Sequence, residues 1–377
     1  MKGKQGLVCM GLLLVLSSCH TGKQITASGL QRKDFQTEVN GQHTDLFTLS
    51  NKQGMEVCIT NYGARVVSIL VPDRNGKRED VVCGFSTITE YMEQRQNFGS
   101  TVGRYIGRIL NARFTLDGVE YKLVPNNGKS GHISHGGNPG FADRIWKVEQ
   151  ADTHRVRLSY LSPDGENGFP GNLKVTLVYS LGEDDNALDL TYEATTDAPT
   201  VLNLSHHSFF NISGNFTKSV EDQQLWVDAD RFTPYDDKKC VTGEYLPVAG
   251  TPLDFRMPHA IGECIDADHP QLKVVNGYDH TWELNTKGDD TRPAAWVYDP
   301  ASGRKMEIFT TEPGIQIYTG NGLKGKMTGK RGIAYPFRSA VCFETMHFQD
   351  SPNQPEFPST VLRPGEVFHS HTVYKFE

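Results

Sequence analysis

The sequence lacks an excess of basic residues, and it lacks an apolar run long enough to cross a membrane. Its 38 Lys and Arg residues are outnumbered by 45 Asp and Glu residues, which gives a formal net charge of −7. Because nucleic-acid-binding surfaces are normally basic, this balance argues against a nucleic-acid partner. The apolar run over residues 7–16 has about ten residues, roughly half of what a membrane-spanning helix requires.

Cysteine is scarce, at 7 residues, and the CxxC spacing typical of a metal site is absent. Without Cys9 and Cys19 the rest of the chain has an odd number of cysteines: Cys58, Cys83, Cys240, Cys264 and Cys342. Export would permit a disulfide, and Cys58 and Cys83 both lie in strand-like segments that could pair. We nevertheless expect all five to be buried free thiols.

The N-terminus has the features of an export signal. Lys2 and Lys4 precede the apolar run, and small residues precede Cys19. This pattern predicts a lipoprotein signal peptide over residues 1–18, with lipid on Cys19 as the sole membrane attachment, in the cell envelope at the outer membrane or periplasmic face. An ordinary signal peptide with an incidental cysteine is the alternative. Residues 19–31 are polar and lack apolar periodicity, so we predict a tether there.

Residues 32–377 show no composition break and no repeat, which predicts one domain. The chain has 37 Gly and 19 Pro residues and many short segments that favour strands. These segments lie at 46–49, 55–60, 65–71, 156–161, 173–181, 187–194, 224–229, 305–311, 315–318 and 367–374. Turn signals such as DRNG at 73–76 separate them. We predict an all-β fold, a large single-domain extended sandwich with few short helices, one of them near residues 87–94.

Two adjacent histidines, His206 and His207, interrupt an otherwise apolar strand-like segment. In a strand their imidazoles point to opposite faces, so only one of them enters a given pocket. Imidazole titrates near neutral pH, which suits it to donate or accept a proton. A structural histidine is the alternative interpretation for either residue.

Glu344 interrupts a second apolar segment, residues 340–348. A carboxylate at such a position needs a partner or a function, because burying an unpaired charge is costly. A structural salt bridge and a functional carboxylate both remain open.

A third segment repeats Gly-Arg, as Gly103-Arg104 and Gly107-Arg108. A phosphate-binding loop would need a strand followed by a helix, and that context is absent here. We expect the glycines to permit close approach of strands and the arginines to reach a polar ligand.

These segments belong to an ordered set of eight motifs, at residues 103–109, 135–137, 162–171, 206–211, 276–280, 314–321, 343–345 and 362–366. From about residue 34 to the C-terminus, the chain resembles the aldose 1-epimerases, also called galactose mutarotases. The resemblance implies a β-supersandwich with a sugar pocket on one sheet face. It also implies interconversion of the α and β anomers of free aldoses such as galactose and glucose.

Site residues follow from the resemblance motif by motif. His207 is expected to be the general acid and Glu344 the general base. Substrate binding is expected from Gly107, Arg108, His135, Ser208, Asp279 and Gln316. The chain departs from the family in having Gly107 and His206 where Asn is common, and Phe209 where Tyr is common. The chemistry requires no metal or other cofactor, although the resemblance is compatible with a bound calcium ion. We expect a monomer.

Other functions fit parts of the sequence. A non-catalytic carbohydrate-binding lipoprotein would bind sugar without turnover. A hexose-6-phosphate 1-epimerase would need several Arg or Lys residues converging on the phosphate. A glycoside hydrolase normally uses two carboxylates, whereas only Glu344 is prominent here.

Overall fold

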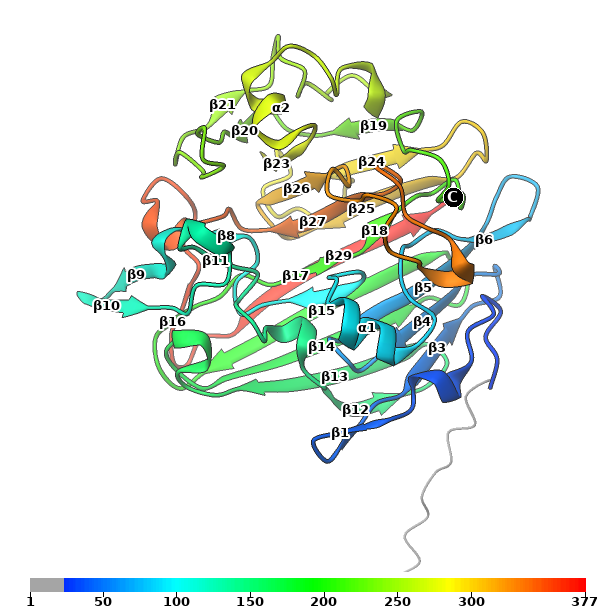
Figure 1. Ribbon diagram of the computed structural model, residues 1–377, viewed down its shortest axis with the longest axis horizontal. Helices are drawn as coiled ribbons and strands as arrows, with labels where there is room; N and C mark the ends of the chain where they lie inside the picture. The colour runs from blue at the N-terminus through cyan, green and yellow to red at the C-terminus, as the bar shows by residue number, and fades with distance from the viewer. Residues whose placement is uncertain (1–23) are drawn as a thin grey trace, which may run out of the picture.

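The computed structural model describes residues 24–377, and its largest element is a nine-stranded sheet (Figure 1). In spatial order its strands are β12 (Lys147–Ala151), β13 (Arg155–Ser162), β14 (Leu173–Leu181), β15 (Ala187–Thr196), β29 (Phe368–Phe376), β25 (Lys305–Thr310), β24 (Ala295–Tyr298), β19 (Gln224–Val227) and β22 (His259–Ala260). Neighbouring strands are antiparallel throughout this sheet. The C-terminal strand β29, red in Figure 1, pairs with β15 and with β25 and so joins the two halves.

Two smaller sheets complete the framework. The six-stranded sheet contains β18 (Phe209–Phe210), β27 (Val341–Met346), β26 (Gly314–Tyr318), β23 (Asp279–Glu283), β20 (Arg231–Thr233) and β21 (Leu246–Pro247). The four-stranded sheet contains β3 (Leu46–Ser50), β4 (Glu56–Thr60), β5 (Arg65–Pro72) and β6 (Arg78–Asp80). One hydrophobic cluster includes Val57, Leu177 and Phe343, one residue from each sheet, so the three sheets share a core. This arrangement confirms the predicted all-β sandwich fold.

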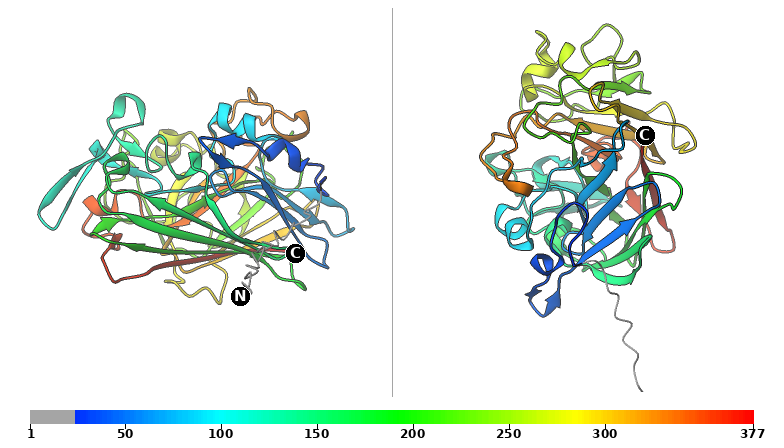
Figure 2. Two further views of the ribbon diagram at one scale, coloured as in Figure 1. Left: turned by 90° about the horizontal axis from the view of Figure 1, so that it is seen from below. Right: turned by 90° about the vertical axis from the view of Figure 1, so that its right-hand side faces the viewer.

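In addition to these three sheets, residues 24–377 form five short strand pairs and two α-helices. The pairs are β1 (Glu38–Val39) with β2 (Gln42–His43), β7 (Ser100–Val102) with β17 (Ser205–His207), β8 (Arg108–Ile109) with β11 (Ile133–Ser134), β9 (Arg113–Leu116) with β10 (Val119–Lys122), and β16 (Thr200–Val201) with β28 (Val361–Leu362). Helix α1 (Ile88–Gln94) starts at a capping box between Thr87 and Glu90, which confirms the predicted helix. Helix α2 (Pro270–Val275) lies in the yellow region at the top of Figure 2, right. Within residues 24–377, no helix is both long and apolar enough to span a bilayer.

The burial pattern and the register of the strands determine which side chains lie together on one face of a sheet. Strand β14 alternates buried and more exposed residues, as its sequence predicts. Strand β27 is buried along its whole length, which accounts for the near-continuous apolar run around Glu344. In the six-stranded sheet, Thr281 pairs with Gln316 and Gln316 with Glu344, so their side chains form a row on one face.

Cys58, Cys83, Cys240, Cys264 and Cys342 are free thiols, as predicted. All except Cys264 are buried.

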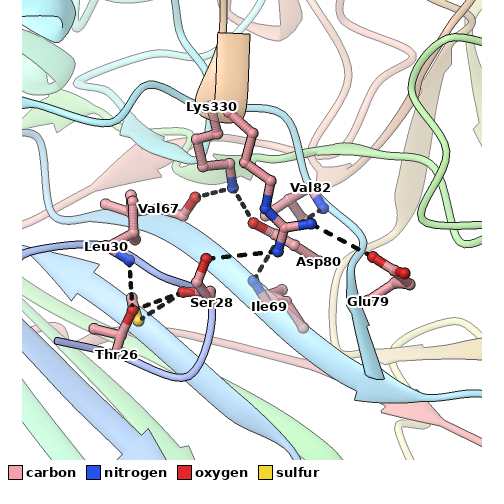
Figure 3. A network of polar contacts seen from close by, with 12 residues as sticks. Thr26, Ser28, Leu30, Val67, Ile69, Glu79, Asp80, Val82 and Lys330 are labelled. Atoms are coloured by element: carbon pink, nitrogen blue, oxygen red, sulfur yellow. Dashed lines mark hydrogen bonds and ion pairs between the residues drawn. The ribbon is translucent and has the colours of Figure 1, made fainter. Parts of the chain in front are cut away.

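The N-terminal residues that the structure describes are packed against the sandwich. Thr26, Ser28 and Leu30, which are labelled in Figure 3, are buried. The backbone N–H of Ser28 donates to Glu56 Oε1 at 3.2 Å. The prediction of a tether over residues 19–31 is therefore wrong for residues 24–31. A polar segment without apolar periodicity packs here because its hydroxyl groups bond one another, as Thr26 Oγ1 and Ser28 Oγ do at 2.9 Å. Residues 1–23, with the predicted signal peptide and Cys19, lie outside the described residues.

A buried ion pair fixes the segment between β26 and β27 onto the four-stranded sheet (Figure 3). Lys330 Nζ lies 2.6 Å from Asp80 Oδ2, and each side chain is 8% exposed. The same segment carries Tyr335, whose ring contacts Phe98, and Phe98 in turn contacts Phe209 with ring centroids 4.9 Å apart. The ion pair therefore supports an aromatic cluster that reaches the strand after β17.

We expect Lys330→Met to lower the free energy of unfolding by about 3 kcal/mol, because it leaves the Asp80 carboxylate buried without its cation. Adding Asp80→Asn should recover a large part of this loss. The amide removes the unpaired charge and still accepts the Ile69 N–H that Asp80 Oδ1 accepts at 3.2 Å. Urea unfolding followed by tryptophan fluorescence measures both changes.

Lys52→Met is the matched control, because the Lys52–Glu183 ion pair is exposed, at 71% and 52%. Its loss should change the free energy of unfolding by less than about 1 kcal/mol. A cost for Lys330→Met no larger than that of the control would contradict the anchoring role of the buried pair.

Candidate active site

His207 and Glu344 face each other in a cavity of 270 Å³. His207 Nε2 lies 3.5 Å from Glu344 Oε1, and the two side chains are only 8% and 5% exposed. His207 is the last residue of β17, and Glu344 lies within β27. The two residues lie close in space because strand β18, which directly follows β17, pairs with β27. The Phe209 ring stacks on the His207 ring, with centroids 5.1 Å apart, and holds the imidazole in place.

Five of the predicted substrate-binding residues line this cavity: Gly107, Arg108, His135, Asp279 and Gln316. The volume lies just below that of typical ligand pockets, which run from roughly 300 to 1,000 Å³, and therefore suits a ligand smaller than most. Polar atoms converge from several elements, since β8, β11 and the three central strands of the six-stranded sheet all border it. Such a lining suits a small ligand with many hydroxyl groups.

The polar side chains of the cavity are held by one another. Thr281 Oγ1 donates to Gln316 Oε1 at 2.5 Å, and Gln316 Nε2 donates to Asp279 Oδ1 at 2.7 Å. Arg108 donates through Nη1 to the Lys239 carbonyl at 3.2 Å. These bonds fix the orientation of the carboxylate and amide groups before a ligand enters.

Ser208 does not line the cavity, so the prediction that Ser208 binds the sugar is wrong. Its side chain is buried on the opposite side of the chain, where Ser208 Oγ lies 2.6 Å from His206 Nε2. His206 also lies 3.5 Å from the hydroxyl of Tyr179, in the core. The expected alternation is confirmed, because His207 faces the cavity and His206 does not.

Arg104 has a structural role, unlike Arg108. Its guanidinium is buried and donates to the carbonyls of Pro170 and Gly171 at 2.7 and 3.0 Å. The expectation that both arginines reach a ligand is therefore wrong for Arg104, whereas Arg108 borders the cavity. Gly103 does permit close packing, since a Cβ there would lie 2.5 Å from the Phe141 ring.

Burial sets the protonation of the site. It lowers the pKa of His207 to about 4 and raises the pKa of Glu344 well above its ordinary value, with the charge of Asp279 adding to the rise. Burial also raises the pKa of Asp279 and lowers the pKa of His135 to about 3. Both histidines of the cavity are therefore neutral at pH 7 in the free protein. Among residues 24–377, Arg108 is the only arginine or lysine that lines the cavity.

The group of potential metal ligands around His207 does not suit calcium. His207, Cys342 and Glu344 place one potential ligand atom each within 4.8 Å of one another. Calcium takes six to eight oxygen ligands, whereas this set offers a nitrogen, a sulfur and one carboxylate. These three residues therefore do not form a calcium site.

The cavity also contains residues that the sequence did not single out as ligand-binding: Gln96, Asn97, Ser134, Phe209, Tyr318, Met346 and Gln349. Tyr318 and Met346 could have been found, because each lies two residues after a predicted site residue on the same strand. Gln349 gave no signal, because it lies in the irregular segment after β27.

The amino-acid sequence is similar to those of known proteins. The sequence model described as "Aldose 1-epimerase" matches residues 45–375. A galactose mutarotase of Sus scrofa is 39% identical over 330 residues, which cover 88% of this chain and 93% of that protein. An aldose 1-epimerase of Escherichia coli (strain K12) is 37% identical over 340 residues, with 89% and 96% coverage.

Solved structures agree. A GalM/aldose epimerase homologue from C. elegans superposes with a TM-score of 0.81 at 31% identity, covering 89% of this chain and 99% of that one. A galactose 1-epimerase from Lactobacillus acidophilus NCFM gives a TM-score of 0.78 at 28% identity, with 90% and 96% coverage.

Proposed function

The chain belongs to the aldose 1-epimerase family, and on this premise we propose that it interconverts the α and β anomers of free aldoses such as galactose and glucose. It is an isomerase. The observation that carries the assignment is the 3.5 Å approach of His207 Nε2 to Glu344 Oε1 inside a cavity bordered by Arg108 and Asp279. One proton donor and one proton acceptor side by side are what ring opening and reclosure require.

The reaction proceeds by two proton transfers. Glu344, as carboxylate, removes the proton from the hydroxyl on C1, while His207, as imidazolium, gives a proton to the ring oxygen. The C1–O5 bond breaks and leaves a free aldehyde, which turns about the C1–C2 bond. Reclosure with the two roles reversed gives the other anomer. No electron is transferred to the enzyme and no covalent intermediate forms.

The pair needs only one transferable proton. A carboxylic acid beside a neutral imidazole holds as many protons as a carboxylate beside an imidazolium, so the two states differ only in where the proton lies. Burial favours the uncharged state in the free protein, and that state is the one that ring opening produces. Polar groups of a bound sugar replace lost water and stabilise the charged state that starts the reaction.

Charge in the cavity argues against a phosphorylated sugar. Of the described residues that line the cavity, Arg108 alone is a permanent cation, and two carboxyl groups, those of Asp279 and Glu344, line the cavity with it. A hexose 6-phosphate carries two negative charges at neutral pH and would need several cations. A carbohydrate-binding protein without catalysis has no need for the buried His207–Glu344 pair, whose desolvation is costly.

We expect His207→Ala and Glu344→Ala each to lower the enzymatic rate of mutarotation by about 10²- to 10⁴-fold, because each removes one proton-transfer group. Polarimetry of freshly dissolved α-galactose and α-glucose measures the rate after subtraction of the spontaneous reaction. Glu344→Gln keeps the shape of the side chain and should be equally impaired.

The matched controls are His43→Ala and Glu193→Gln, which alter exposed residues that do not line the cavity. Both should keep the wild-type rate. Near-wild-type mutarotation by a folded His207 or Glu344 variant would remove these assignments.

The pH profile should show that the pair works as a unit. Below the lowered pKa of His207, about 4, both groups are protonated and no base remains. Above the raised pKa of Glu344 both are deprotonated and no acid remains. We therefore expect kcat/KM to fall as the pH drops through about 4, to be nearly constant above that limb, and to fall again once the pH exceeds the raised pKa of Glu344. An acidic limb centred near pH 6.5, the ordinary pKa of histidine, would contradict the desolvation of His207.

We also propose that Cys19 is lipidated and holds the enzyme in the cell envelope, at the outer membrane or periplasmic face. The support is the order of Lys2 and Lys4, a short apolar run and small residues before Cys19. The test is to express the full chain and its Cys19→Ala variant in bacteria that are supplied with radiolabelled palmitate. The full chain should incorporate the label, and the variant should not. Equal labelling of both, or of neither, would contradict the proposal.

A further inference from the structure

We propose that Gln349, in the segment after β27, binds the sugar. Its carboxamide takes the place of the polar group that a side chain at position 107 would otherwise bring into the cavity. This inference rests on the proposed function, because it adds a contact to the same sugar. Gln349 is 5% exposed and lines the cavity with Gly107, Arg108 and Gln316.

Gln349 occupies the space in front of Gly107. A Cβ at position 107 would lie 2.5 Å from Gln349 Cγ and 3.0 Å from Gln349 Cδ. The first distance is far below van der Waals contact, so no side chain at 107 can coexist with Gln349 in this conformation.

The backbone alone does not impose glycine at this position. Gly107 has φ of +74°, in the left-handed region where asparagine is the least disfavoured of the other residues. Asparagines of this same chain adopt that region, with φ of 55° at Asn111, 51° at Asn167 and 62° at Asn276. Exclusion of an asparagine at 107 therefore comes from the Gln349 side chain.

The Gln349 carboxamide is held among residues of the cavity. Its Nε2 donates to the Tyr235 hydroxyl at 2.7 Å and to Gln316 Oε1 at 3.3 Å. Its Oε1 accepts from the Arg108 backbone N–H at 3.3 Å. The following residue is fixed as well, because the Asp350 N–H donates to the Arg108 carbonyl at 2.8 Å.

Two of the three bonds to this carboxamide are long and therefore weak, which leaves it able to bind a ligand. A sugar hydroxyl can take the second hydrogen of Nε2 in place of Gln316, or donate to the free lone pair of Oε1. The hydrogen bonds of the carboxamide go to Tyr235, Gln316 and Arg108 and to neither catalytic residue, so we place its contact on a part of the sugar away from the reacting atoms.

The first test separates binding from chemistry. Gln349→Ala should raise KM for galactose about 3- to 10-fold, the effect of losing one uncharged hydrogen bond, and should leave kcat within about threefold of wild type. Gln150→Ala, at an exposed position on β12, is the matched control and should change neither value. An unchanged KM in a folded Gln349→Ala variant would overturn the proposal.

The second test uses the shared space. Gly107→Asn in the wild-type background should lower kcat/KM more than 10-fold, because the new side chain collides with Gln349. In the Gln349→Ala background the same change should be harmless or should restore part of the lost affinity. Equal loss in both backgrounds would show that the two side chains do not compete, and would contradict the proposal.

Calorimetric titration of galactose into each variant gives the dissociation constant without turnover. The wild-type protein reports on the proposed function itself, because an inactive wild type that binds sugar would refute catalysis and leave the Gln349 contact measurable. The dissociation constant should follow KM across the variants. A Gln349→Ala protein that binds galactose as tightly as wild type would overturn the contact whatever the activity.

Discussion

The rest of the site depends on one constraint, the burial of an acid and a base side by side. Removing His207 and Glu344 from water destabilises the charged form of each, so the pair prefers to be neutral and to hold a single mobile proton. Proton transfer to and from a sugar then requires little change in the charge of the cavity. Burial also excludes bulk water, which strengthens the hydrogen bonds that position the substrate.

Every strand near the pair contributes to that burial. Strand β27 is covered on both faces, and the Phe209 ring stacks against the His207 imidazole. The aromatic contacts continue through Phe98 to Tyr335, whose segment is fixed to the four-stranded sheet by Lys330 and Asp80. The geometry of the catalytic pair is thus linked by direct packing to an ion pair outside the cavity. The opposite wall is polar, and there Gln349 fills space that Gly107 leaves open.

The residue pattern alone predicted many of the strands and marked Glu344 and the His206–His207 pair as unusual. Alternation identified β14, and the carboxylate within an apolar run marked Glu344 as unusual. Period two also showed that only one of His206 and His207 could face a pocket, but not which one. That choice came from the family motif, as did the assignment of Ser208, which the structure places in the core with His206.

Other features could not be predicted, because they depend on contacts between distant segments. Residues 24–31 look like a linker in sequence, yet hydroxyl and carboxylate partners fold them onto the sandwich. Gln349 lies in an irregular segment, where neither period two nor period 3.6 indicates the direction of a side chain. Only the folded chain brings the Gln349 side chain in front of Gly107.

The most direct test of the central claim is exchange between anomers at equilibrium, measured by two-dimensional NMR on galactose labelled with ¹³C at C1. An enzyme accelerates exchange in both directions, whereas a sugar-binding protein only shifts populations or broadens signals. The account predicts cross-peaks between the α and β C1 signals that grow with the concentration of wild-type protein and vanish in the Glu344→Gln variant. Exchange no faster than in buffer, with wild-type protein that binds galactose, would contradict it.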